Sequence, residues 1–117
     1  MDSDSTPPIV NLHPVPLPPD ILESIQQVFP GTFETVRQRL TQLQHEDSQL
    51  FSDRILRCMI FCAWRYPRST LEHWIAEAKT DYRDLIVAAE YDRNDTHLRD
   101  LNRPFLYADF SERPTRF

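Results

Sequence analysis

Apolar residues recur at intervals of three and four along most of this chain, which is the periodicity of an α-helix packed on one side. The pattern predicts helices over residues 20–29, 32–46, 52–65, 69–80 and 81–92. The stretch from Cys58 to Trp64 is apolar on every face, which is typical of a helix buried on most sides. We therefore expect an all-α fold with four or five short helices packed around a central helix at about residues 52–65.

Short polar residues mark several of the predicted helix ends. Asp20 with Glu23, and Ser69 with Glu72, have the spacing of a capping box. Thr80 and the aspartate that follows it suit a helix start better than a helix interior. We therefore predict a break near Thr80 between the last two helices. One long helix is the alternative, because the apolar register continues through the break.

The two ends of the chain lack the helical pattern. Residues 1–19 hold six of the ten prolines, which favours a disordered, polyproline-like leader. Residues 20–110 are expected to form one helical domain, followed by a tail at 111–117. Residues 96–101 are expected to form one short helical turn. The aromatic segment 105–110 is predicted to pack as an extended strap across the helices, because it is too aromatic for a solvated end.

Composition and charge exclude several classes of protein. A single glycine among 117 residues excludes the glycine-rich loops that hold nucleotide phosphates. No apolar run approaches the roughly 20 residues that span a bilayer, and the acidic start resembles no signal peptide, so we expect no membrane partner. The formal charge is −5, which makes nucleic acid an unlikely partner.

Two cysteines lie four residues apart on the predicted central helix. Cys58 and Cys62 could form half of a soft-metal site, but no further cysteine or matching histidine pair is present. Free cysteine is among the most buried residue types, so core packing is the favoured interpretation. Two thiols on one helix also fit a reducing compartment, and we expect a cytoplasmic protein without a cofactor.

One polar stripe could carry metal or acid–base chemistry. In a continuous helix, His73, Glu77, Asp81 and Asp84 would lie within about a quarter of the circumference. A histidine with three carboxylates can bind a divalent metal or transfer protons. This stripe supports the alternative function of a small enzyme, although a helix break near Thr80 would divide it.

The favoured function is a non-catalytic regulatory or interaction module that binds another protein. Residues 1–50 carry seven acidic residues and two arginines, so this half could meet a basic patch on a partner. The candidate partner-binding residues are Arg37, Arg39, Glu46, Tyr66, Tyr107 and Phe110. Residues 16–19 also match P-x-x-P, but no basic residue flanks them, so a plain solvated leader is favoured.

A third hypothesis concerns four arginines. Arg54, Arg57, Arg65 and Arg68 share one helical face and could contact phosphates if they are exposed together. Pro67 interrupts that helix, and the overall charge is negative. Ion pairs between helices are the favoured role for the charges at the start of the central helix.

Overall fold

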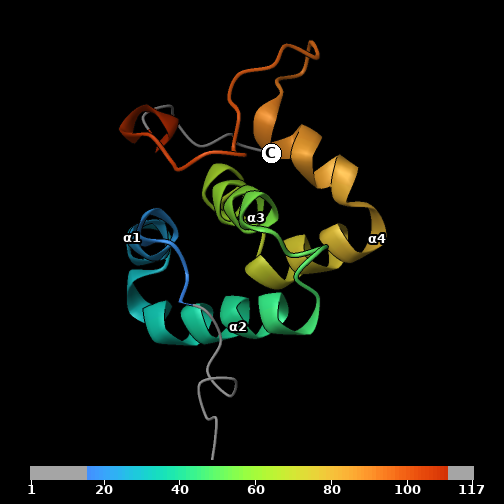
Figure 1. The fold of residues 1–117 in the computed structure, drawn as a ribbon. Helices are drawn as coiled ribbons and strands as arrows, with labels where there is room; N and C mark the ends of the chain where they lie inside the picture. Colours follow the sequence, from blue (N-terminus) through green and yellow to red (C-terminus); the bar gives the residue numbers. More distant parts are fainter. Residues whose placement is uncertain (1–15, 111–117) are drawn as a thin grey trace, which may run out of the picture.

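The computed structural model describes residues 16–110, and within this range the regular elements are all helical (Figure 1). They are α1 (Pro19–Val28), the 3₁₀ helix η2 (Pro30–Thr32), α2 (Phe33–Glu46), α3 (Asp53–Arg65), α4 (Leu71–Glu90) and the 3₁₀ helix η3 (Tyr107–Phe110). The predicted all-α class is therefore confirmed. Most of the predicted leader, residues 1–15, and the predicted tail, 111–117, lie outside the described residues.

Helix α3 occupies the centre of the molecule, and α1, α2 and α4 surround it (Figure 1). Met59, Ile60 and Phe61 are fully buried, as the apolar run predicts. Burying one side chain of this kind contributes about 1.5–3 kcal/mol to folding. The helix begins at Ser52, whose hydroxyl accepts a hydrogen bond from the N–H of Ile55 at 3.4 Å. The central helix predicted at residues 52–65 is confirmed.

Helix α4 breaks where the sequence predicts. Asp81 has φ −159° and ψ 99°, which is an extended conformation inside an otherwise helical segment. Its carboxylate accepts a hydrogen bond from the N–H of Arg83 at 3.0 Å and so starts the second arm, residues 82–90. Thr80 ends the first arm with a hydrogen bond from its hydroxyl to the carbonyl of Ala76 at 2.9 Å. The chain turns sharply at this point, on the right of Figure 1.

Both predicted capping boxes are wrong. Helix α1 begins after Pro18 without a side-chain cap, because the Asp20 carboxylate forms ion pairs elsewhere. Helix α4 is capped by Thr70, one residue after the predicted Ser69. The Thr70 hydroxyl accepts a hydrogen bond from the N–H of His73. Ser69 instead accepts a hydrogen bond from the indole N–H of Trp74 at 2.7 Å. Asp20 is thus used in a long-range ion pair, whereas Ser69 is used in local hydrogen bonds with Trp74 and Tyr66.

The helical turn predicted at 96–101 is also wrong. After α4 the chain makes a tight loop that brings Tyr91 and His97 together as an isolated antiparallel bridge. The Asp92 carboxylate closes this loop, because it accepts the N–H of Thr96 at 3.0 Å. The N–H of Leu98 bonds to the carbonyl of Glu90 at 2.7 Å rather than to a helical partner. Residues 96–101 are therefore held against the end of α4 in a non-helical conformation.

The C-terminal aromatic segment packs on the helices, with one change from the predicted strap. It runs extended as far as Leu106 and then turns into η3. The Asp109 carboxylate causes this turn, since it accepts the N–H of Leu106 and pairs with Arg103 at 2.9 Å. The ring of Phe110 packs edge-on against Trp64 with centroids 5.3 Å apart.

The proline-rich segment before α1 takes part in the core. Leu17, which the sequence places in the disordered leader, is buried with the core residues of α1 and α3. The P-x-x-P segment at 16–19 is therefore anchored by its leucine, and the hypothesis that these residues are a plain solvated leader is wrong. The Leu17 side chain is therefore not available to bind a proline-recognition groove on another protein.

Candidate functional site

The predicted metal site on α4 does not form. The extended conformation of Asp81 interrupts the helical face that would join His73 and Glu77 to Asp84. The Asp81 carboxylate pairs with Arg83, and these hydrogen bonds lower the pKa of Asp81. Across residues 16–110, no group of three or more histidine, cysteine, aspartate or glutamate side chains is placed to hold a metal ion. The hypothesis of a metal site on this stripe is therefore wrong.

The predicted arginine face does not form either. Arg57 is buried, and its guanidinium pairs with Asp20 at 2.9 Å and donates to the carbonyl of Leu101 at 3.2 Å. Arg65 is also buried, whereas Arg68 is exposed beyond the end of α3. These arginines cannot contact a nucleic acid together. Arg57 instead forms an ion pair that joins α3 to α1, which is the role favoured by the sequence.

The most enclosed charged side chain is Glu90, which the sequence analysis did not single out. Its side chain is 0% exposed, and its carboxylate receives hydrogen bonds from Arg54 at 2.8 and 3.0 Å. The backbone N–H of Leu101 donates at 3.2 Å, and His97 Nε2 lies 3.2 Å away. Glu90 thus connects α3, α4 and the loop after α4. A substrate cannot reach a carboxylate that is wholly enclosed, so its role is structural.

A signal for this cluster was present in the sequence. Glu90 lies one turn after Ile86 and directly follows Ala89, so it belongs to the apolar face of the second arm of α4. A carboxylate on a face that packs inward needs a cationic partner. In the structure Arg54, at the start of the central helix, supplies that partner.

Both cysteines belong to the core, as predicted. Cys58 and Cys62 are fully buried and are not joined in a disulfide. Burial raises the pKa of each thiol well above its ordinary value, and the charge of Glu90 adds to this effect at Cys58. A thiol of this kind stays protonated and unreactive.

The candidate partner-binding residues on α2 are already engaged or isolated. Arg37 forms an ion pair with Glu34 on the same helix. Arg39 forms a bidentate pair with Glu72, which joins α2 to α4. Glu46 is exposed at the end of α2, where its carboxylate accepts a hydrogen bond from Gln42 at 3.0 Å. These charged side chains are thus held by contacts within the chain.

The candidate aromatic residues divide into two places. The ring of Tyr66 packs against Trp74 with centroids 5.5 Å apart, so it supports the start of α4. Tyr107 and Phe110 both lie on η3, beside α1. Tyr107 is 97% exposed, and its neighbour Leu106 is 54% exposed. The structure therefore brings Tyr107 and Phe110 together at one place on the surface.

These two residues line a groove between α1 and η3, which we call the α1–η3 groove. It encloses about 570 Å³ and is lined by Asp20, Glu23, Ser24, Gln26, Gln27, Phe105, Leu106, Tyr107 and Phe110. Because Ile21 and Ile25 face the core, α1 presents its polar positions to the groove. One wall is therefore polar and the other is aromatic and aliphatic.

Hydrogen bonds hold the aromatic wall in position. Asp20 Oδ2 accepts the N–H of Phe105 at 3.0 Å and also pairs with Arg57. Burial alone would raise the pKa of Asp20, but the hydrogen bonds from Arg57 and Phe105 prevail and lower it. Phe110 closes the inner end of the wall against Phe61, with centroids 5.7 Å apart. The chain's own hydrogen bonds and ring contacts thus hold this wall of the groove.

The groove carries net negative charge. Of its two carboxylates, Asp20 is neutralised by Arg57, whereas Glu23 is exposed and forms no ion pair within residues 16–110. No lysine or arginine is among the described residues that line it. The first 36 residues of the sequence hold five acidic residues and no lysine or arginine.

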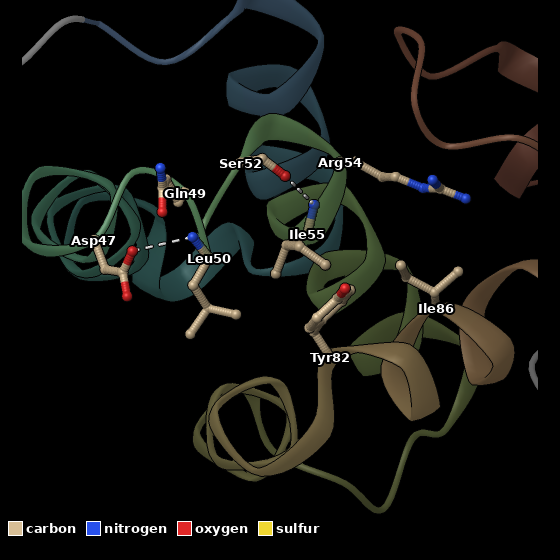
Figure 2. Close-up of a pocket in the computed structure, with 8 residues that line it drawn as sticks. All are labelled: Asp47, Gln49, Leu50, Ser52, Arg54, Ile55, Tyr82 and Ile86. Carbon is tan, nitrogen blue, oxygen red and sulfur yellow. Dashed lines mark hydrogen bonds between the residues drawn. The ribbon is translucent and has the colours of Figure 1, made fainter.

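A second groove, the α3–α4 groove, lies between the loop after α2, the start of α3 and the second arm of α4 (Figure 2). It encloses about 480 Å³ and is lined by Asp47, Gln49, Leu50, Ser52, Arg54, Ile55, Tyr82 and Ile86. Tyr82 is 47% exposed. The polar groups at its rim serve the fold, because Asp47 and Ser52 accept backbone N–H groups and Arg54 extends away towards Glu90.

Comparisons with models of protein families, with curated proteins and with solved structures each found no match. Over residues 16–110, no helix has both the length and the apolar composition needed to cross a membrane. The function must therefore be argued from the grooves and the charged groups of this chain.

Proposed function

We propose that this chain is a non-catalytic module that binds another protein through the α1–η3 groove. The observation that carries the proposal is the nearly complete exposure of Tyr107, next to the half-exposed Leu106, at the rim of a formed groove. Tyrosine is enriched at the centres of protein interfaces, where it combines a large contact area with few rotatable bonds.

The side chains around Tyr107 support this role. Leu106 and Tyr107 are exposed, while Phe105 and Phe110 are partly buried against the core. A partner that covered this wall would remove a continuous apolar surface from water, at about 25 cal/mol for each Å² buried. Exposed apolar patches of this kind mark interaction sites on monomeric proteins.

The groups that could perform chemistry support a binding role as well. Glu90 is enclosed, Asp20 is paired with Arg57, and both thiols are buried with a raised pKa. These groups stabilise the fold, so a partner would contact the chain without a covalent step. Two unpaired thiols on one helix also suit a reducing compartment, and we include a cytoplasmic location in the proposal.

The test is affinity capture of partners from native lysate with three forms of the full chain. We expect Tyr107→Ser to lose the partner, because it removes the exposed ring at the groove. Tyr82→Ser is the matched control, since it removes a half-exposed tyrosine from the α3–α4 groove.

The control also separates the two grooves. Retention by Tyr82→Ser together with loss by Tyr107→Ser supports the proposal. Loss of the partner by Tyr82→Ser together with retention by Tyr107→Ser would contradict the proposal and indicate binding at the α3–α4 groove. Equal capture by both variants and by the unchanged chain would contradict a role for either groove.

A further inference from the structure

We propose that the α1–η3 groove binds a cationic and apolar segment of the partner, with an arginine placed between Glu23 and the ring of Tyr107. This inference depends on the proposed function and adds the chemistry of the ligand. Its basis is the opposite character of the two walls of one groove: carboxylate and amide on α1, aromatic and aliphatic at η3.

The first argument is charge complementarity. Two carboxylates line the groove, and only the Asp20 carboxylate has a cation, supplied by Arg57. Glu23 is exposed and forms no ion pair with the described part of the chain. The last turn of α1 contains no basic residue to offset the negative end of its helix dipole. An approaching cation would therefore meet favourable charge at Glu23 and at the C-terminal end of α1.

The second argument comes from the aromatic wall. A guanidinium group can lie over an aromatic face and pair with a carboxylate through its edge at the same time. The chain already uses the first of these contacts, since the guanidinium carbon of Arg99 lies 4.2 Å from the ring centroid of Phe61. Tyr107 offers an uncovered ring of the same kind, and Glu23 supplies a carboxylate in the same groove.

The apolar part of the ligand follows from the neighbours of Tyr107. Leu106 is half exposed, and Phe105 and Phe110 line the groove beside it. An aliphatic or aromatic side chain next to the arginine would cover this surface. A free cation alone would leave it in water, so a peptide segment fits better than a small cationic molecule.

The size of each effect can be stated. A solvent-exposed ion pair is weak, so Glu23→Gln should weaken binding about two- to fivefold. Tyr107 supplies the ring that the arginine would cover, and Tyr107→Ser should weaken binding about tenfold or more. The affinity should fall as salt is raised from 0.05 to about 0.5 M, because screening acts on exposed charges.

The experiment is a phage-display selection of random 12-residue peptides against the full chain, followed by affinity measurement on synthetic copies of the selected peptides. We expect the selected sequences to be enriched in arginine beside leucine, phenylalanine or tryptophan. Glu23→Gln should weaken their binding, and Glu23→Arg should weaken it further. Glu46→Gln is the matched control, since it removes an exposed carboxylate from α2 and should leave binding unchanged.

The outcomes separate this inference from the proposed function. Selected peptides without basic residues, still lost with Tyr107→Ser, would overturn the inference and leave the groove as the binding site. Peptides that bind Tyr107→Ser and Glu23→Arg as well as the unchanged chain would overturn both. Far-ultraviolet circular dichroism of each variant verifies that a loss of binding does not arise from unfolding.

Discussion

Two glutamates show how differently this molecule uses the same side chain. Glu90 is enclosed at the junction of α3 and α4, where Arg54, His97 and a backbone N–H surround its carboxylate. Glu23 projects from α1 into an open groove and has no cation of its own within the described range. At Glu90 the chain supplies every hydrogen-bond partner of the carboxylate itself. At Glu23 the carboxylate and the Tyr107 ring in the same groove remain exposed, where a ligand could contact them. We therefore assign Glu90 to the stability of the fold and Glu23 to the proposed binding of a ligand.

The strongest test of the comparison is the removal of the Glu90 carboxylate. Glu90→Ala leaves the Arg54 guanidinium and the N–H of Leu101 without their acceptor, and loss of one partner of a buried pair costs about 3–5 kcal/mol. Urea denaturation should show this decrease in the free energy of unfolding. A change no larger than that of Glu23→Ala would contradict the assignment of Glu90 to the stable region.

Asp20→Asn should give the next largest decrease. Asp20 lines the groove but pairs with the buried Arg57, and its substitution should lower the free energy of unfolding by about 2–3 kcal/mol at pH 7. Because the pKa of Asp20 is lower in the folded chain, its contribution is fully present above the ordinary aspartate pKa and decreases as the pH falls through the folded value.

The pH dependence supplies the control for this variant. The difference in stability between the unchanged chain and Asp20→Asn should shrink as the pH falls below about 4, and urea titrations at several pH values measure it. A difference that stayed constant from pH 7 down to pH 2 would mean that the ion pair with Arg57 is not its source.

Phe110→Ala tests the boundary between the two regions. Phe110 packs against Phe61 and Trp64 on one side and lines the groove on the other. We expect a loss of about 2 kcal/mol in unfolding free energy, because the ring is only partly buried. Peptide binding should fall as well. A variant that lost stability but kept full affinity would show that the inner end of the groove is not part of the contact.

Tyr107→Ser should have the smallest effect on stability and a large effect on binding. Its ring is almost fully exposed, so the unfolding free energy should change by less than about 0.5 kcal/mol. Thermal denaturation of the two forms should overlap while the affinity for the selected peptides falls. A marked loss of stability would place Tyr107 in the core and remove the main support for the groove.

The sequence predicted the parts of the fold that depend on local pattern. The all-round apolar run from Cys58 to Trp64 identified α3, and the polar pair at Thr80 identified the break in α4. The capping box at Asp20 failed because its carboxylate pairs with Arg57, far along the chain, which spacing does not reveal. The capping box at Ser69 failed because the indole of Trp74, five residues later, donates to its hydroxyl and Thr70 caps the helix instead.

The candidate site was harder to predict for the same reason. Tyr107 and Phe110 were among the candidate partner-binding residues, and they lie together in the groove. Glu23 was assigned to a cap, and the groove that it lines exists only after residues 105–110 fold back beside α1. That pairing spans most of the chain, and no local pattern encodes it.

The edge-on contact between Trp64 and Phe110 has a practical consequence. The chain contains two tryptophans, and the second, Trp74, is buried against Tyr66 at the start of α4. In a Trp74→Phe variant, the remaining indole would report on the contact that Trp64 makes with Phe110 of η3, beside its contact with Phe61 of α3. A substitution or condition that displaced η3 would expose this indole to water and shift its fluorescence emission to longer wavelength, so the assembly of the groove could be followed by light without attaching a dye.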